Sequence, residues 1–331
     1  MLGWRDRTYD GEGQSEMTLV AVDIGGTNVR FALVGDSGLT RQVSVLCQDH
    51  PTFEDAFSAY LSGLDMKVTA ASIAVAGPAQ APHVEVTNNG WRFGKRDLMV
   101  ALGLDHLLVV NDFTAQALAQ SDPKAHGNLP ILGGAGHGDA PLLVIGPGTG
   151  LGVAALVSSS AGLVTLEGEG GHVGFAPQDS AELDLLRRLW DEQPHVSAED
   201  FVSGGGLETI YRLQSGDRLT APEIGAAALA DDGPARDAVN RMLAILGSVM
   251  ADAALSMGCW RGAVIAGGIV AQLMPLLDAS PFAARFRHQG KMGRLLADIP
   301  VWLSVDPQAG LRGAAAAFDN ASLQPRKLSA G

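Results

Sequence analysis

The sequence contains little cysteine and few aromatic residues. Its 331 residues include two cysteines, Cys47 and Cys259, and only 5% Phe, Trp and Tyr. Two distant cysteines exclude a disulfide scaffold, provide no closely spaced pair of metal ligands and favour a reducing compartment, which we take to be the cytoplasm. The shortage of aromatic residues argues against a surface that stacks bases.

Basic residues are also scarce relative to acidic ones. The 23 Lys and Arg residues are outnumbered by 36 Asp and Glu residues, which gives a net charge of −13. Binding to DNA or RNA needs clustered basic residues that neutralise phosphates, so the composition argues against a nucleic-acid partner. A small anion can still be held locally by backbone N–H groups.

Long apolar runs are missing as well. No run approaches the roughly 20 residues that span a bilayer, and residues 1–16 contain no apolar signal core. We therefore expect no membrane span and no secretory signal. Residues 1–16 are polar and are expected to form a disordered extension; Met17, directly before the first expected strand, is an alternative start.

Glycine is abundant, with 42 residues. Short strand-like runs alternate with helical periodicity, which predicts an α/β protein, and the length favours two domains. The loop-rich segment 127–141 is a candidate boundary. Beyond it, residues 141–156 repeat the strand, glycine turn and strand seen near the start, which indicates two related halves. Further strands are expected at 18–24, 28–34, 71–77, 106–113, 263–268 and 300–305, and helices at 53–61, 181–190, 197–213, 234–257 and 311–323.

Two glycine turns interrupt strand pairs. A tight hairpin with glycine at positive φ explains the first turn. However, its aspartate interrupts an apolar strand, where an unpaired carboxylate is costly, and small residues leave backbone N–H groups free to face an anion. Neither turn fits a P-loop or the dinucleotide fingerprint, because no lysine follows and the next element is a strand. Two such turns, each with a threonine, suggest two clamps on a chain of phosphates: Asp23, Gly25, Gly26, Thr27 and Asn28 in one, and Gly146, Gly148, Thr149 and Gly150 in the other.

Carboxylates and a histidine stand at strand and loop ends. Asn111 and Asp112 end a strand where a helix begins, so a helix cap and a general base for an alcohol explain them equally well. Glu169 and His172 flank two glycines. A satisfied loop carboxylate and a surface histidine explain them, but the glycines would also let both side chains approach one small ligand, and a carboxylate and an imidazole are directional partners for sugar hydroxyls. No third ligand stands nearby, which argues against a metal pair. Glu199 follows an expected helix cap, and in the first helical turn the helix dipole alone favours it.

Six blocks, taken together and in order, resemble the bacterial glucokinase family of the sugar kinase, heat-shock 70 and actin superfamily. The resemblance covers about residues 18 to 320. It implies ATP-dependent phosphorylation of D-glucose to glucose 6-phosphate, the first step of glycolysis. It also implies a ribonuclease-H-like fold of two α/β domains around a ligand cleft, and we expect the small domain at 17–122 with 312–331 and the large domain at 123–311. The blocks are VAVDIGGTNVRFALV, VVNDFTAQALA, VIGPGTGLGVAAL, LEGEGGHVGFAP, HVSAEDFVSGGGLETIYR and VIAGGIV.

The resemblance also implies roles for individual residues. Asp112 matches the catalytic base, and Mg²⁺ on the ATP phosphates would be reached by Asp23 through water. Trp91, in VTNNGWRF, is expected to pack rather than to bind, and a homodimer is a family expectation. The implied glucose ligands are Asn88, Asn111, Asp112, Glu169, His172 and Glu199, and the implied ATP-binding residues are those of the two glycine turns with Gly204, Gly205, Gly267 and Gly268.

Other functions on the same scaffold stay open. A kinase of another hexose or an amino sugar would share the motifs, although the cysteine-rich zinc motif of ROK kinases cannot be built from two distant cysteines. A non-catalytic sugar sensor would need a DNA-binding segment, for which residues 1–16 are too short and too mixed in charge. An actin-like filament or a chaperone ATPase would not need Glu169, His172 and Glu199.

Overall fold

The computed structural model describes residues 17–87, 89–124, 127–288 and 290–330. The expected disorder of residues 1–16, and the expected role of Asn88, lie outside the described residues. The chain divides into two units. Unit 1 is Met1–Ala119 with Gln308–Gly331, and unit 2 is Gln120–Pro307.

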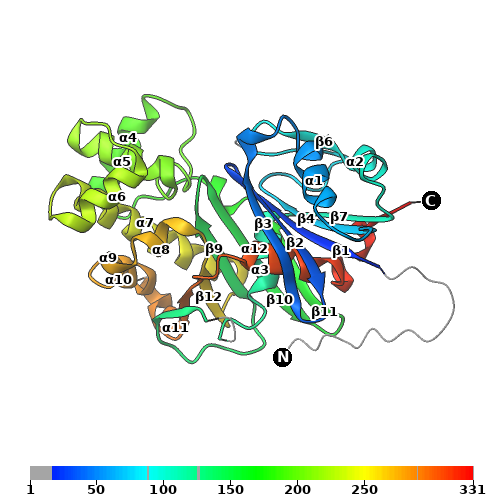
Figure 1. Ribbon diagram of the computed structural model, residues 1–331. Coiled ribbons are helices and arrows are strands. Elements are labelled where there is room, and N and C mark those ends of the chain that lie inside the picture. The colour runs from blue at the N-terminus through cyan, green and yellow to red at the C-terminus, as the bar shows by residue number, and fades with distance from the viewer. Residues whose placement is uncertain (1–16, 88, 125–126, 289, 331) are drawn as a thin grey trace. The chain divides into compact units, whose positions relative to one another are not determined.

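Unit 1 is built on a six-stranded sheet in the order β14-β7-β4-β1-β2-β3, with a small β5-β6 hairpin beside it (Figure 1). Strand β1 pairs antiparallel with β2 and parallel with β4, and β4 pairs parallel with β7. The elements of unit 1 are β1 Leu19–Ile24, β2 Asn28–Gly35, β3 Gly38–Leu46, α1 Phe53–Ser62, β4 Ala70–Val75, β5 His83–Glu85, β6 Arg92–Gly94, α2 Lys95–Leu102, β7 His106–Asn111, α3 Asp112–Ala119, α12 Ala309–Phe318 and β14 Leu328–Ser329, with short 3₁₀ turns at Cys47–Asp49 and Ala321–Arg326.

Helices cover both faces of this sheet. Alternation along β4 sends Ile73 into the cluster that contains Phe57 of α1, whereas its neighbour Ser72 donates a hydrogen bond to the carbonyl of Ala314 in α12 at 2.6 Å. Figure 1 shows α1 and α2 together on one side of these strands. Because β1 and β4 are buried along their whole length, they lack the alternating pattern of a half-exposed strand.

Unit 2 repeats the same arrangement. Its sheet has the order β11-β10-β9-β12-β13-β8; β9 is antiparallel to β10 and parallel to β12, and β12 is parallel to β13. The strand order and directions match those of unit 1, which supports the prediction of two related halves. The elements of unit 2 are β8 Leu129–Leu132, β9 Leu142–Pro147, β10 Leu151–Ser159, β11 Gly162–Gly168, α4 Ser180–Trp190, α5 Gly204–Ser215, α6 Ala221–Ala230, α7 Pro234–Met257, β12 Gly262–Ile265, α8 Gly268–Gln272, α9 Met274–Leu277, α10 Phe282–Arg287, α11 Gly293–Ala297 and β13 Val301–Leu303, with 3₁₀ turns at Gly170–His172 and Gly290–Met292.

Helix α7 is the centre of the helical layer of unit 2, next to α5, α6 and α10 (Figure 1). It is the one helix among the described residues that is long and apolar enough to span a membrane, but 67% of its apolar window is buried within the protein. Its Gly247 permits the close approach of α10, since an added Cβ would lie 2.5 Å from the carbonyl oxygen of Phe282. The expected core helix at 234–257 is confirmed with the same bounds.

Several expected elements differ from the structure. The segment 127–141 contains strand β8, which pairs with β13. The helix expected at 197–213 begins only at Gly204, because Ser203 is its cap and accepts a hydrogen bond from the N–H of Gly206. The closing helix ends at Phe318 and is followed by a 3₁₀ turn. Strands β3 and β11 were not expected; their partly exposed sequences have no continuous apolar run.

Candidate active site

The carboxyl ends of three parallel strands meet at one edge of the sheet of unit 1. Ile24 is level with Val75, and Val75 with Asn111. Binding residues of open α/β sheets gather where such strands end. Register therefore places Asp23 and the turn after it in the same row as Asn111 and Asp112, although these segments lie far apart in the sequence.

Asp23 is a buried carboxylate, with 9% of the residue exposed. Burial raises the pKa of this carboxyl, and Arg30, whose Nη1 lies 3.1 Å from Oδ2, opposes that rise. Helix α12 approaches closely because position 310 is glycine: an added Cβ would lie 2.5 Å from Oδ2 of Asp23. The fold thus holds an acidic group in an environment that disfavours its charge.

The turn at 25–28 is fixed from three directions. The N–H of Gly25 donates to the carbonyl of Asn28 at 2.9 Å, and the N–H of Cys47 donates to the carbonyl of Thr27 at 2.8 Å. Asn89 Nδ2 donates to the carbonyl of Gly25 at 3.2 Å. The expected positive φ is wrong for Gly25, and its N–H is not free for an anion, because the turn uses that group internally. The N–H groups of Gly26 and Thr27 donate to no other residue that the structure describes.

Asn111 and Asp112 do cap a helix. The N–H of Phe113 donates to Asn111 Oδ1 at 2.9 Å and to Asp112 Oδ1 at 3.0 Å, and α3 begins at Asp112. Asn111 Nδ2 also donates to the carbonyl of Gly77 at 3.3 Å. Both residues are half-buried. The cap orients Asp112 without removing it from solvent, so capping and chemistry are compatible in this residue.

In unit 2 the glycine segments come together. The N–H of Gly148 donates to the carbonyl of Gly150 at 2.7 Å, and the N–H of Gly204 donates to the carbonyl of Gly148 at 2.9 Å. Gly267 has φ +92°, and an added Cβ would lie 2.7 Å from the carbonyl of Pro147. The turn at 146–150, the start of α5 and the end of β12 therefore meet in one place, as their proposed common ligand requires. The N–H of Gly148 is satisfied within the turn.

Glu199 lies against this turn. The N–H of Leu151 donates to Glu199 Oε2 at 2.6 Å, and a side chain at Gly150 would collide with the same carboxylate. The N–H of Glu199 in turn donates to the carbonyl of Gly171 at 2.9 Å. Glu199 is therefore bonded to the glycine turn on one side and to the segment of Glu169 and His172 on the other.

The expected helical position of Glu199 is wrong. Ser197 does not cap a helix; its N–H and Oγ both donate to Asp200 Oδ2 at 2.7 Å, which closes a turn over residues 197–200. Burial of Ala198, Phe201 and Val202 anchors this turn in the core. The carboxylate of Glu199 is consequently directed by a turn rather than by a helix dipole.

Glu169 and His172 flank a 3₁₀ turn beside β10. Glu169 bridges to Val153, the N–H of His172 donates to the carbonyl of Glu169 at 3.0 Å, and both residues are exposed. Gly171 between them is buried so tightly that any side chain would collide with the carbonyl of Leu151. Backbone contacts, and His195 Nε2 at 3.2 Å from the carbonyl of His172, fix this segment without using the side chains of Glu169 and His172.

Comparison with known proteins decides the family. The glucokinase family model matches residues 19–321. The chain belongs to the glucokinase family. A glucokinase of Neisseria meningitidis is 40% identical over 311 residues, which cover 91% of this chain and 94% of the relative. Membership confirms the resemblance seen in the sequence and makes the protein an ATP-dependent hexose kinase.

Solved structures confirm the actin-like α/β fold class of this glucokinase-family chain. A glucokinase from an Antarctic psychrotroph is 32% identical with a TM-score of 0.81, covering 93% of this chain and all of that one. A ROK family glucokinase from Streptomyces griseus, solved in complex with glucose and AMPPNP, is 21% identical with a TM-score of 0.61, covering 90% of this chain and 98% of that one. The latter likeness shows the fold alone.

Trp91 packs, as expected of it. It is 6% exposed, its ring centroid lies 5.9 Å from that of Phe53, and its Nε1 donates to the carbonyl of His50 at 3.3 Å. Its N–H donates to Asn89 Oδ1 at 2.9 Å. Asn89 thus links the packed tryptophan to the glycine turn of this glucokinase-family protein.

The sequence did not single out three residues that support the site: Arg30, Asn89 and Gly310. Arg30 had a detectable signal, because hairpin pairing through the turn places it directly opposite Asp23. The contacts of Asn89 and Gly310 join segments distant in the chain, so no local pattern indicates them.

A resident metal cluster is not found: no group of three or more His, Cys, Asp or Glu side chains suitable for a metal ion occurs within the described ranges. Asp23 nevertheless fits the expected role toward ATP-bound Mg²⁺. Arg30 engages Oδ2, and no hydrogen bond from a described residue reaches Oδ1. Mg²⁺ in kinases typically keeps several waters and takes one or two carboxylates besides the phosphates, which a single buried aspartate can serve.

Proposed function

We propose that this glucokinase-family enzyme transfers the γ-phosphoryl group of ATP to the 6-hydroxyl of D-glucose, with residues of both units serving one reaction. The observation that carries the proposal is the hydrogen bond between Glu199 and the N–H of Leu151. It joins a group suited to sugar hydroxyls to the end of a turn suited to phosphates, which a kinase needs and a sugar sensor does not. The ligand cleft implied by the resemblance stays a prediction.

Asp112 is proposed as the general base. A sugar hydroxyl has a very high pKa and becomes a good nucleophile only as a base accepts its proton while the new P–O bond forms. Phe113 N–H donates to Oδ1, which fixes the rotation of the carboxylate at the start of α3. A fixed carboxylate avoids the reorganisation that a mobile base would need at the transition state.

The phosphates of ATP are proposed to meet backbone N–H groups of both turns. Gly26 and Thr27 in unit 1 and Thr149 and Gly150 in unit 2 are the better candidates, because Gly25 and Gly148 use their N–H groups within the turns. Thr27 and Thr149 are exposed and add hydroxyl donors. Gly204, Gly205, Gly267 and Gly268 would let the nucleotide approach the backbone. When bound, Mg²⁺ neutralises charge on the phosphates, with Asp23 holding one of its waters.

The sugar is proposed to bind Glu169, His172, Glu199 and Asn111, and Asn88 by family resemblance. Carboxylates and an imidazole accept and donate hydrogen bonds in fixed directions, which distinguishes one arrangement of hydroxyls from another. Glu169 and His172 flank the 3₁₀ turn at Gly170–His172, and a backbone hydrogen bond joins this turn to the separate turn that carries Glu199 in unit 2. A ROK family glucokinase of the same fold was solved in complex with glucose and AMPPNP, which supports a sugar and a nucleotide as the two ligands proposed for this chain.

A coupled assay for glucose 6-phosphate tests the proposal. Purified full-length protein is given ATP and Mg²⁺ with D-glucose, fructose, mannose or N-acetylglucosamine, and bare ATP hydrolysis is measured without sugar. We expect glucose to give the highest kcat/KM. A higher value for another hexose would reassign the substrate, and ATP hydrolysis that no sugar stimulates would indicate the filament or chaperone alternative.

Glu169→Gln provides a second arm of the assay. We expect a strongly raised KM for glucose, with Asp184→Asn, an exposed residue of α4, as the control that leaves KM unchanged. An unchanged KM in Glu169→Gln would remove Glu169 from the sugar site.

We also propose that the protein is a cytoplasmic homodimer. Sedimentation of the full chain would check its oligomeric state.

A further inference from the structure

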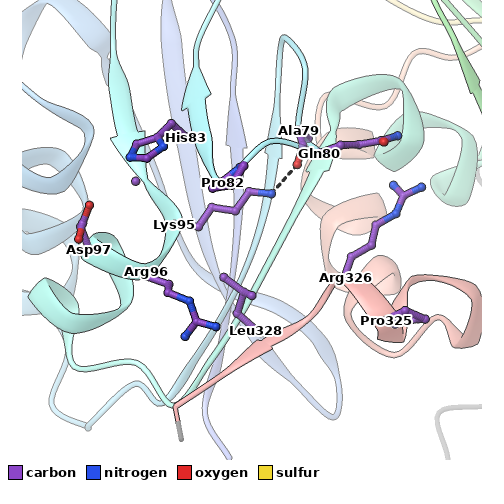
Figure 2. A pocket seen from close by; sticks show the side chains of 11 residues that line it. Ala79, Gln80, Pro82, His83, Lys95, Arg96, Asp97, Pro325, Arg326 and Leu328 are labelled. Carbon is purple, nitrogen blue, oxygen red and sulfur yellow. Dashed lines mark hydrogen bonds between the residues drawn. The ribbon is translucent and has the colours of Figure 1, made fainter.

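A pocket of about 680 Å³ lies in unit 1, between the loop before β5, the start of α2 and the chain before β14. Figure 2 shows Arg96 and Arg326 on opposite sides of Leu328, with their guanidinium groups pointing apart. Arg326 already interacts with another described residue, and Lys95 Nζ donates to a backbone carbonyl at 2.6 Å. These cations therefore do not converge on one ligand. A side chain with a defined role lies instead in unit 2, next to His172.

Two segments of unit 2 form a short antiparallel ladder. One, residues 171–175, carries His172, and the other, residues 196–199, ends at Glu199. Three backbone hydrogen bonds of 2.9 Å join them, from the N–H groups of Phe175, Ala198 and Glu199 to the carbonyls of Val196, Val173 and Gly171, respectively. The ladder connects two of the turns that hold the proposed sugar ligands, so its geometry sets how far apart those ligands stand.

The carbonyl of His172 is bonded by a side chain. None of the three backbone bonds of the ladder uses this carbonyl, and His195 Nε2 lies 3.2 Å from its oxygen. A carbonyl oxygen can only accept a hydrogen bond, so Nε2 must carry the proton in this contact. Both the protonated ring and one neutral tautomer meet that condition. His195, the residue just before the second segment, thereby fixes the peptide group of a proposed sugar ligand directly.

The backbone and the ring of His195 are themselves held in place. Gln193 Nε2 donates to the carbonyl of His195 at 2.9 Å. Asp200, which closes the next turn by accepting from Ser197, lies within electrostatic reach of the ring. Burial raises the pKa of the Asp200 carboxyl, but hydrogen bonds, among them those from Ser197, and the charge of His195 outweigh burial and lower that pKa. The ring therefore interacts with both turns that carry proposed sugar ligands.

We propose that His195 is a positioning residue for glucose: by holding the backbone of His172, it aims this side chain and that of Glu169 at the sugar. The inference rests on the proposed function and deepens it, because His195 itself touches neither substrate. Two glycines lie between Glu169 and His172, and glycine leaves the backbone free to adopt many conformations. Both side chains are exposed, so packing does not orient them. A bond that fixes this backbone lowers the ordering entropy that glucose binding would otherwise cost.

Steady-state kinetics of full-length variants tests this role. His195→Phe keeps a planar ring but removes the donor, whereas His195→Gln keeps an amide N–H that can reach the same carbonyl. We expect His195→Phe to raise KM for glucose about two- to tenfold for the loss of one hydrogen bond, with KM for ATP and kcat nearly unchanged. His195→Gln should restore most of the wild-type KM. A loss of folded protein would lower the apparent kcat without this split between the two KM values, and the Tm measures that loss separately.

Two further variants are the controls. His137→Phe makes the same change at another exposed histidine of unit 2 and should leave KM for glucose unchanged. In a His172→Ala background, His195→Phe should raise KM for glucose less than it does in the wild type, because His195 acts through His172. Additive effects in the double variant, an unchanged KM for glucose in His195→Phe, or equal rises for glucose and ATP would each overturn the proposal.

Glucose phosphorylation by the wild type is measured in the same assay. A wild type that does not phosphorylate glucose would overturn the proposed function and, with it, the role of His195. An active wild type whose KM for glucose is the same as that of His195→Phe would overturn the positioning role alone.

Discussion

Glu199 Oε2 accepts a 2.6 Å hydrogen bond from the N–H of Leu151, the first residue of β10 after the glycine turn. A charge-assisted bond of this kind is stronger than a neutral one. The carboxylate that family resemblance assigns to sugar is thus also a support of the turn assigned to ATP. One residue would therefore affect the binding of both substrates.

Replacing Glu199 tests this double role. Glu199→Ala leaves the N–H of Leu151 without its acceptor, which costs about 1–3 kcal/mol, equivalent to about 5- to 150-fold in a binding constant. We expect KM to rise for ATP as well as for glucose, and Glu199→Gln, which keeps a neutral acceptor, to affect ATP less. Steady-state kinetics with each substrate varied in turn provides the measurement. A rise confined to glucose would mean that Glu199 binds sugar only.

Asp112→Asn separates chemistry from capping. Asparagine caps helices as well as aspartate does, and Asn111 already accepts from the N–H of Phe113, so stability should be unchanged. Loss of a general base should lower kcat by about 10²–10⁴-fold with little effect on glucose binding. Turnover is measured with the coupled assay, binding by glucose titration and folding by the Tm. If turnover fell less than about tenfold, Asp112 would not be the base.

Asp23→Asn should stabilise the protein while impairing activity. Burial keeps the pKa of Asp23 above its ordinary value of 3.8, so the folded state binds the proton more tightly than the unfolded chain does. The free energy of unfolding then falls as the pH rises from 3.8 through the folded pKa. In this window the folded state still holds the proton that the unfolded chain has already lost.

The amide avoids this loss at neutral pH. We expect a higher Tm for Asp23→Asn at pH 7, by roughly 2–4 °C for each kcal/mol recovered, and no gain below about pH 3.8. Thermal unfolding across this pH range checks the sign. Asp36→Asn, an exposed residue of the same antiparallel β1–β3 segment, is the control and should leave the Tm unchanged. A lower Tm at pH 7 would show that the pairing with Arg30 outweighs the burial of the charge.

We expect Asn89 to affect the KM for ATP, because it holds the turn at 25–28. Its Nδ2 donates to Gly25 and its Oδ1 accepts from Trp91. Asn89→Asp keeps the acceptor and loses the donor, so it should raise KM for ATP by about tenfold while Trp91 stays packed. Tryptophan fluorescence monitors the packing. Equal KM values in the wild type and Asn89→Asp would contradict a positioning role.

Gly313→Ala should be strongly destabilising. A Cβ at Gly313 would collide with the backbone of Ala115, where α12 crosses α3. Backbone atoms cannot rotate away, so we expect a loss of about 1–3 kcal/mol or more in unfolding free energy. Gly225→Ala in α6 is the matched control: its Cβ would meet only a flexible Leu273 methyl at 3.6 Å, and alanine favours helix by about 1 kcal/mol. Urea unfolding of both variants gives the comparison.

Patterns local in the chain predicted much of the fold. The helix at 234–257 was located by its apolar stripe, and the strand, glycine turn and strand of each half were located by their apolar runs. Errors arose where a polar side chain redirected the backbone: Asp200 holds Ser197 in a turn, and the cap of α5 is Ser203. Either serine satisfies the sequence rule for a cap, and only packing of Phe201 and Val202 selects the second.

The sequence by itself determined the α/β class, the family and the types of residue that stand at strand ends, because apolar period, turn chemistry and motif order are all local properties of the chain. Tertiary structure alone decided which groups meet. Pairing in register brought Asn111 level with Val75 and Ile24, and close backbone approach brought Glu199 to Leu151 and Gly310 to Asp23. Such contacts depend on the position of distant segments in space, and that position is set by the burial of the sheets and helices as a whole.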